Sequence, residues 1–143
     1  IKCITGPIED VLKKLNGRKF DVILVDNVLH LLRNPFFFLS SISKNISTGG
    51  CVVASVTNTS ELVATIRAVL NGRRDVIPPK FEKHGTHLTN RYVIKKWFRK
   101  NNFDIIRFES DLSGSKRLQI KKAFPKVHFL FANRFIVKAT LKN

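Results

Sequence analysis

Apolar residues follow two different patterns along this chain, and together they predict an α/β fold. Two continuous apolar runs rich in β-branched residues, 20–26 and 50–56, predict buried strands of a parallel sheet. Apolar residues spaced three or four positions apart predict helices between the strands. The expected helices cover 8–15, 36–46, 60–70, a segment starting at Thr89 or Asn90, and 116–123; further strands are expected at 2–5, 103–109 and 133–140.

Polar residues stand where the two apolar runs end. Asp26 closes the first run, and Asn58 follows the second. Ligands of parallel α/β sheets bind just beyond the carboxyl ends of the strands. We therefore expect the functional site at Asp26 and Asn58. Residues 73–88 contain Pro78-Pro79 and no apolar period, which predicts a long loop, with 73–86 as the most mobile internal segment.

Several motifs resemble one known family. FDVILVDNVLHLLRNP (20–35) and GGCVVASVTN (49–58) are similar to the segments around the fourth and fifth strands of class I S-adenosylmethionine-dependent methyltransferases. LNGR (70–73), GTHLT (85–89), and FP with LFANRFIV (124–137) resemble later segments of one branch. The resemblance implies a Rossmann-like sheet of order 3-2-1-4-5-7-6 with an antiparallel last strand. Only the part from strand 3 or 4 onward would be present, as a single domain over residues 1–143.

The resemblance also implies an activity and a cofactor. Methyl transfer from S-adenosyl-L-methionine would proceed by in-line displacement, with the protein supplying proximity and alignment. The acceptor stays open, because its selection lies in loops that vary on one fold. The family's glycine-rich cofactor loop and ribose-binding acid have no counterpart in this sequence. We expect the chain to be the carboxyl-terminal portion of a longer polypeptide and to bind the cofactor weakly by itself.

By resemblance, Asp26, Asn27 and Val28 would line the methionine end of the cofactor, mostly through backbone atoms. The alternative for Asp26 is a cap on the helical turn that follows it.

Gly6 and Ile8 fall where the family binds adenine, and Ile8 would pack on the ring. Pro7 stands in place of the usual aspartate and has no side-chain acceptor. The alternative is a helix start followed by a core isoleucine.

Three residues are candidates for substrate contact: His30, Asn58 and His87. His30 is displaced by one position from the family's histidine, about 100° around a helix, and Leu31 takes that slot. We expect His30 to be a partly exposed surface histidine, with substrate contact as the alternative. His87 matches the histidine of the family's THL segment and is the preferred candidate. His84 and His87 lack a third ligand, so no metal is expected, and no catalytic residue is assigned.

Basic residues are concentrated in the second half of the chain. Lys and Arg number 26 against 10 acids, for a net charge of +16, and residues 67–143 carry +14 of it. An anionic partner is expected there, nucleic acid before an acidic membrane surface, although a basic surface can also exist without a polyanion. The leading contacts would be Arg91, Lys95, Arg99, Lys121 and Lys122. The alternative function is thus a non-catalytic basic interaction module.

Three further expectations concern the environment of the chain. No apolar stretch is long enough to span a bilayer. Cys3 and Cys51 are expected as core residues of a cytoplasmic protein. Without strands one and two of the resembled sheet, strand 20–25 would be an apolar edge carrying only Asp21 as a charge. We expect this edge to pair two copies of the isolated chain into a homodimer or to make that chain poorly soluble, whereas in a complete polypeptide the first strand would cover it.

Overall fold

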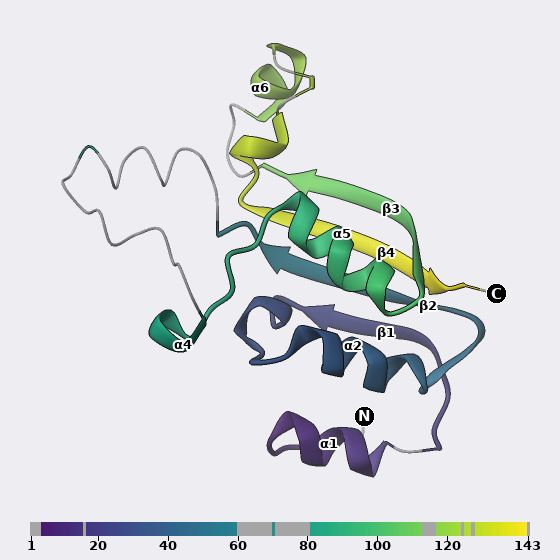
Figure 1. Ribbon diagram of the computed structural model, residues 1–143. Coiled ribbons are helices and arrows are strands. Elements are labelled where there is room, and N and C mark those ends of the chain that lie inside the picture. Colours follow the sequence, from purple (N-terminus) through teal and green to yellow (C-terminus); the bar gives the residue numbers. More distant parts are fainter. Residues whose placement is uncertain are drawn as a thin grey trace.

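Helices and strands alternate along the first part of the chain, and the last two strands are antiparallel, with α6 and η3 between them in the chain (Figure 1). The computed structural model describes residues 4–15, 17–59, 70, 81–112, 117–123, 125–126 and 128–142. The elements in chain order are α1 (Ile8–Lys14), β1 (Phe20–Asp26), η1 (Leu29–Leu31), α2 (Pro35–Ser43), β2 (Ile46–Thr57), α4 (Phe81–His84), α5 (Arg91–Lys100), β3 (Phe103–Asp111), α6 (Arg117–Ala123), η3 (His128–Phe131) and β4 (Arg134–Leu141).

The four strands form one mixed sheet of order β1-β2-β4-β3. β1 and β2 are parallel, with Val25 opposite Ala54, and β4 runs antiparallel to both of its neighbours. This is the order expected for the last four strands of the resembled sheet, 4-5-7-6. The predicted α/β fold and antiparallel last strand are confirmed.

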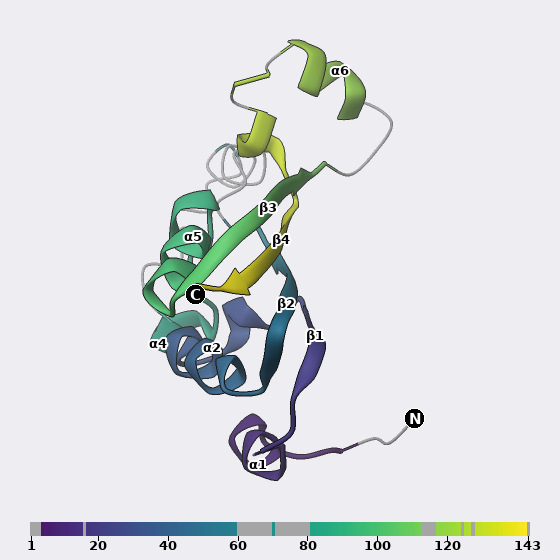
Figure 2. The ribbon, with the colours of Figure 1, turned by 90° about the vertical axis from the view of Figure 1, so that its right-hand side faces the viewer.

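Helices α2 and α5 cover one face of the sheet, as the two orthogonal views show (Figures 1 and 2). The core between these layers is closely packed, because its largest side chains are wholly buried. They include Leu39, Val52, Ile94, Phe98 and Phe135. The apolar run of β1 predicts burial on both faces, and this is wrong for the described residues. Val22 is 59% exposed and Leu24 71% exposed, because no described element covers that face of β1.

β1 and β2 approach closely at Gly50. A Cβ atom built there would lie 2.9 Å from the carbonyl oxygen of Asp21 and 3.0 Å from that of Phe20. Both atoms belong to the backbone of β1, so a side chain at this position would push the two strands apart. Glycine therefore permits the parallel pairing that places the ends of β1 and β2 side by side.

Three local expectations differ from the structure. The helix expected over 36–46 ends at Ser43, because Asn45 donates its side-chain amide to the carbonyls of Leu15, at 2.7 Å, and Arg18, at 2.9 Å. Ile46 is therefore the first residue of β2 and is buried there. Residues 4 and 5 form no strand, since no described strand lies beside them.

The loop expected over 73–88 contains the short helix α4. Residues 73–80, most of the helix expected over 60–70, and Cys3 lie outside the described residues. Cys51 is buried and free, as expected of a core cysteine.

Candidate active site at the carboxyl ends of the strands

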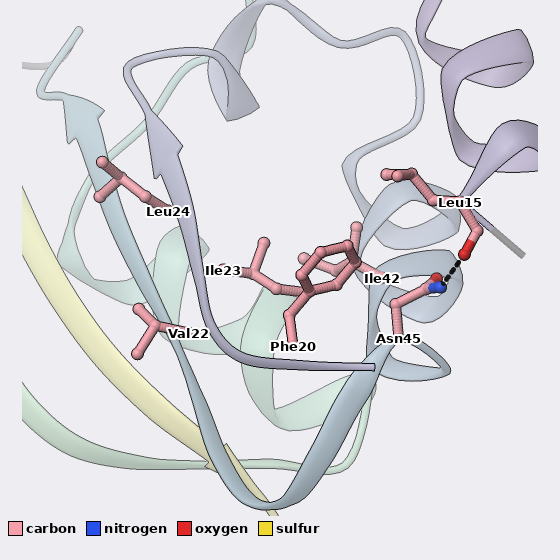
Figure 3. Close-up of a pocket in the computed structure, with 7 residues that line it drawn as sticks. All are labelled: Leu15, Phe20, Val22, Ile23, Leu24, Ile42 and Asn45. Atoms are coloured by element: carbon pink, nitrogen blue, oxygen red, sulfur yellow. Dashed lines mark hydrogen bonds between the residues drawn. The ribbon is translucent and has the colours of Figure 1, made fainter. Parts of the chain in front are cut away.

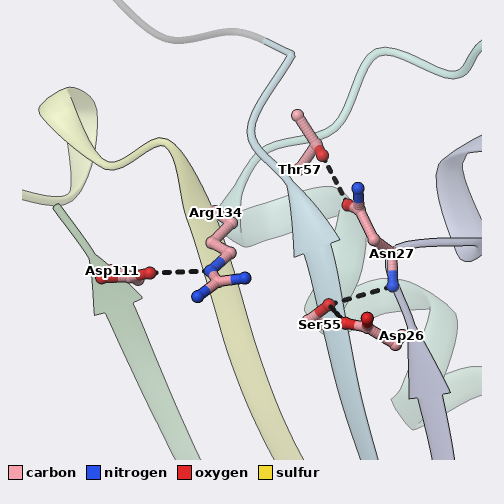
Figure 4. A network of polar contacts seen from close by, with 6 residues as sticks. All are labelled: Asp26, Asn27, Ser55, Thr57, Asp111 and Arg134. Carbon is pink, nitrogen blue, oxygen red and sulfur yellow. Dashed lines mark hydrogen bonds and ion pairs between the residues drawn. The ribbon is translucent and has the colours of Figure 1, made fainter. Parts of the chain in front are cut away.

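A network of short polar contacts joins the carboxyl ends of β1 and β2 (Figure 4). The Ser55 hydroxyl donates to the Asp26 carboxylate at 2.5 Å. The Asn27 backbone N–H donates to Ser55, at 2.9 Å to its hydroxyl and 3.0 Å to its carbonyl oxygen. Thr57 donates its hydroxyl to the Asn27 side-chain oxygen at 2.5 Å. Both strands therefore hold Asp26 and Asn27 in place where a parallel sheet offers its ligand site.

Asn27 turns the chain out of β1 through a left-handed conformation, with φ of +53°. Asparagine tolerates this region better than most residues. Asp26 and Asn27 are exposed, whereas Val28 is half-buried and packs on the core. Val28 is the N-cap of η1 and no side chain of the described residues, Asp26 included, caps that turn, so the alternative of Asp26 as a helix cap is wrong. Asp26 instead faces Ser55.

Gly6 and Ile8 lie at the start of α1. Gly6 has φ of +138°, a value that few residues with a side chain adopt. Ile8 is half-buried and packs against the core, so the helix-start interpretation is confirmed. Ile8 also borders a cavity of about 140 Å³ that Leu12, Leu32 and Phe38 help to line. Drug-sized ligand pockets typically enclose roughly 300–1,000 Å³, so this cavity has room for only part of a nucleoside.

His30 is buried, contrary to the sequence-based expectation of a surface histidine. The residue is only 7% exposed, and the segment leading into α5 lies against it, because the His87 N–H donates to the His30 carbonyl at 2.8 Å. Among the described residues, none is a hydrogen-bond partner of the His30 Nδ1 atom. Burial lowers the pKa of His30 below its usual value, and the nearby His87 lowers it further. The imidazole of His30 is therefore neutral at pH 7.

His87 connects the segment before α5 to residues at the ends of η1 and β2. Its Nε2 lies 2.8 Å from the Leu32 carbonyl oxygen, which only accepts, so Nε2 carries the proton. Its ring stacks on that of Phe81, with 4.7 Å between the ring centres, and forms a T-shaped contact with Trp97, with 5.6 Å between the ring centres. The Thr59 hydroxyl donates to the His87 carbonyl at 3.1 Å. His87 therefore lies close to His30 and beside the end of β2, while its contact with a substrate stays a prediction.

Asn58 joins the end of β2 to the segment before β4. Its side-chain amide donates to the Ala132 carbonyl, and its backbone N–H donates to the Asn133 carbonyl, both at 2.8 Å. The side chain is buried. The structure shows a positioning role for Asn58, and its contact with a substrate also stays a prediction.

At the same end of the sheet, Arg134 and Asp111 form an ion pair that the sequence analysis did not predict. Arg134 opens β4 and Asp111 closes β3; their side chains lie 2.7 Å apart (Figure 4). Arg134 is also opposite Thr57 in the β2–β4 register. The signal in the sequence was a charged residue at each strand end, but only the antiparallel register brings the two together. Within the parts of the chain that are described, no cluster of three or more metal-ligating side chains occurs.

The buried His30 makes stability depend on pH. Its pKa in the folded protein lies below the unfolded value of about 6.5, so the unfolded chain takes up the proton first as pH falls. We expect the contribution of His30 to the free energy of unfolding to be complete above the unfolded pKa. Below that pKa the contribution should fall progressively until the pH reaches the pKa of the folded protein. Urea unfolding between neutral pH and the onset of carboxylate titration would show this loss. His30→Asn should flatten the dependence. An unchanged dependence in His30→Asn would contradict the assignment to His30.

Comparison with solved structures identifies the fold. The chain is similar to a SAM-dependent methyltransferase from Archaeoglobus fulgidus, with a TM-score of 0.61 and 13% identity, over 95% of this chain and 66% of that one. It is similar to magnesium protoporphyrin IX methyltransferase (ChlM) from Synechocystis PCC 6803 with bound SAH, with a TM-score of 0.55 and 16% identity, over 88% and 47%. The fold is that of the class I methyltransferases.

The similarity to these structures is a similarity of fold, and it covers only part of their length. The chain spans about half the length of several of the structures that it matches. A third match is the [4+2]-cyclase SpnF, with a TM-score of 0.54 and 13% identity, over 85% of this chain and 49% of that one. The same fold thus serves more than one chemistry. No family profile matches the sequence, and no curated protein matches it significantly.

Proposed function

We propose that this chain takes part in methyl transfer from S-adenosyl-L-methionine to an acceptor of unassigned class. The observation that carries the proposal is the polar network at the carboxyl ends of the parallel strands β1 and β2. Asp26 and Asn27 are exposed there and held by Ser55 and Thr57. The fold in which this network occurs is that of methyltransferases, one of which was crystallised with SAH.

The chemistry of these side chains suits one end of the cofactor. S-adenosylmethionine carries an ammonium group and a sulfonium, both cationic. One oxygen of the Asp26 carboxylate accepts from Ser55, and a carboxylate offers about four acceptor sites, so capacity remains for a cationic group. Asn27 and Val28 would complete that end. At the adenine end, Ile8 would supply apolar contact, but Pro7 supplies no side-chain acceptor, so the fit there is incomplete.

When bound, the cofactor supplies an electrophilic methyl group. Asp26 and Asn27 would orient its methionine end, because both are fixed by hydrogen bonds from β2. His87 and His30 lie on the segments next to that site and would face the acceptor, with Asn58 holding the end of β2. The contribution of these residues would be alignment and the exclusion of water rather than bond-making.

We expect weak cofactor binding by the 143-residue chain. The cavity beside Ile8 is small, and Pro7 leaves the adenine amino group without a side-chain acceptor. Calorimetric titration of S-adenosylmethionine into this chain and into the full gene product would measure both affinities. Micromolar binding by the 143-residue chain would contradict this expectation, and no binding by either protein would overturn the proposed function.

The matched variants Asp26→Asn and Asp21→Asn test the site. Both aspartates lie on β1 and both accept from a serine of β2, Asp26 from Ser55 and Asp21 from Ser47 at 2.6 Å, but at opposite ends of the strand. We expect Asp26→Asn to weaken cofactor binding about tenfold through loss of a charged contact, and Asp21→Asn to leave it unchanged. The same titration measures both. An equal effect of the two substitutions would remove Asp26 from the site.

A second candidate function is binding of an anionic partner without methyl transfer. The observation that favours it is the row of cations on α5, which no acidic residue of that helix interrupts. This candidate predicts that the protein binds heparin at low salt and releases it as the salt concentration is raised.

We also propose that the 143-residue chain by itself pairs with a second copy through β1 or is poorly soluble. That strand forms one edge of the sheet, and a cavity of about 220 Å³ beside it is lined mainly by apolar side chains (Figure 3). The apolar side chains are those of Leu15, Phe20, Val22, Ile23, Leu24 and Ile42, and Asn45 is the polar residue of the lining. No helix in the described parts of the chain is long and apolar enough to cross a membrane. The free, buried Cys51 suits the reducing cytoplasm, which we propose as the location.

A further inference from the structure

Helix α5 carries a row of three cations, two of which lie over the Phe108 ring of β3. Arg91, Lys95 and Arg99 are spaced four residues apart, which places them along one side of the helix. Partial burial lowers the pKa of Lys95, and the neighbouring Arg91 and Arg99 lower it further. Like charges at this spacing repel each other and destabilise a helix. A polyanion bound along the row would relieve that repulsion.

Aromatic rings hold the row in position. The Arg91 guanidinium lies 5.7 Å from the ring centre of Phe108 and 5.6 Å from that of Phe129. The Lys95 ammonium lies 5.2 Å from the centre of Phe108. These distances are those of cation–π contacts, which orient a cation without neutralising it. The positive charge of the row therefore stays available to a ligand.

The acidic residues nearby are engaged elsewhere. On β3, Asp104 pairs with Lys142, Glu109 with Arg107, and Asp111 with Arg134. Among the residues that the structure describes, none of the ion pairs includes a cation of α5. The exposed face of this helix therefore has an unopposed positive charge.

One aromatic side chain lies exposed among these cations. Tyr92 is 74% exposed, and helical geometry sets it between the row of Arg91, Lys95 and Arg99 and a second row that contains Lys96. A tyrosine ring in this setting offers a surface on which an unpaired base can stack while the cations on either side contact phosphates.

We propose that the exposed face of α5 binds single-stranded nucleic acid, with Arg91, Lys95, Lys96 and Arg99 contacting phosphates and Tyr92 stacking on a base. The inference rests on the second candidate function above, for which it names the partner class, and is independent of methyl transfer. In both views of the ribbon, η3 and α6 lie beyond the start of α5 (Figures 1 and 2). The exposed Lys121 and Lys122 of α6 would extend the same surface.

The structure favours a nucleic acid over a membrane. A helix that lies on a membrane buries an apolar face among the lipids. The apolar residues of α5, Ile94, Trp97 and Phe98, are buried in the protein core and face away from solvent. Only its cationic face is free, and an exposed ring among cations discriminates unpaired bases from a duplex.

Charge-neutralising variants test the phosphate contacts. Lys96→Ala with Arg99→Ala removes two exposed cations from α5, and Lys14→Ala with Lys138→Ala removes two exposed cations from α1 and β4 as a matched control. Fluorescence anisotropy with labelled oligouridine and oligothymidine would measure affinity as salt is varied. We expect the α5 variant to bind about 25-fold more weakly at about 0.1 M salt, with a salt slope smaller by about 1.4. The control should stay within about twofold of the native protein.

Variants of Tyr92 test the stacking. Tyr92→Ala should weaken binding of the single strands about fivefold or more, while Tyr92→Phe, which keeps the ring, should restore it. Heparin, which has no bases, should bind both variants equally. The RNA and DNA probes then show whether the 2′-hydroxyl matters.

Four results would overturn the inference: equal losses in the α5 variant and its control, no effect of Tyr92→Ala, equal affinity for a duplex, or tighter binding to anionic phospholipid vesicles. If any of these results is obtained but the protein still binds heparin, the second candidate function, binding of an anionic partner, is retained. Absence of heparin binding would remove that candidate as well. The cofactor titration is a separate measurement and decides methyl transfer independently.

Discussion

Replacing Trp97 by alanine is expected to lower the free energy of unfolding by about 3–5 kcal/mol. Trp97 lies on the buried face of α5, is 4% exposed and is part of the core between α5 and the sheet. Its removal leaves a cavity that the surrounding side chains fill only in part. The free energy of unfolding of most domains is about 5–15 kcal/mol, so this single substitution would remove a large part of it. Urea unfolding followed by far-ultraviolet circular dichroism would measure it.

The same substitution should loosen the segment that carries His87. The Trp97 and His87 rings form a T-shaped contact, and the His87 N–H donates a hydrogen bond to the carbonyl of the buried His30. Hydrogen exchange at the His87 amide should therefore accelerate in Trp97→Ala by more than global destabilisation explains. Tyr92→Ala on the exposed face of α5 serves as the control and should change stability by less than about 0.5 kcal/mol. A loss below about 1 kcal/mol in Trp97→Ala would contradict the buried packing.

Charged residues on β1 are expected to abolish self-association of the protein. Val22 and Leu24 are exposed on an edge strand, and a lysine there discourages pairing with another chain. The positive charge of the protein is concentrated after residue 66, so two β1 edges can approach with little repulsion. We expect the unsubstituted 143-residue chain to sediment as a dimer or larger species at high concentration, and its Val22→Lys, Leu24→Lys variant to sediment as a monomer.

The opposite edge of the sheet supplies the control. β3 also has an exposed apolar residue, Ile106, 62% exposed, but it carries charged side chains along its length. These are Asp104, Arg107, Glu109 and Asp111. Ile106→Lys should therefore leave the sedimentation of the native protein unchanged. A native protein that is monomeric at high concentration, with the amides of residues 22–25 exchanging freely, would refute pairing through β1.

Local patterns in the sequence were sufficient for most helices and strands. The runs 20–26 and 50–56 fall within β1 and β2, and the stripe of Ile94, Trp97 and Phe98 is the buried face of α5. The Asn90 side chain caps α5 by accepting from the Val93 N–H, as one of the two expected caps. These features depend on residues near one another in sequence, so periodicity and capping chemistry predict them.

Part of the candidate site was also readable in advance. Asp26 and Asn27 stand at the carboxyl end of a buried run, and parallel sheets bind ligands there. The structure adds that β2 holds both residues through Ser55 and Thr57. The sequence showed these hydroxyl groups but not the β1–β2 register that sets Ser55 opposite Asp26.

The sequence by itself determined the order of elements, the apolar faces, the polar strand ends and the basic second half, because each follows from the spacing and type of nearby residues. Only the tertiary structure decided the burial of His30, the start of β2 at Ile46, the pairing of Arg134 with Asp111 and the bare face of β1. The physical reason is shared by all four. Each depends on a segment distant in the chain that covers, bonds to or leaves open the position, and no local period carries that information.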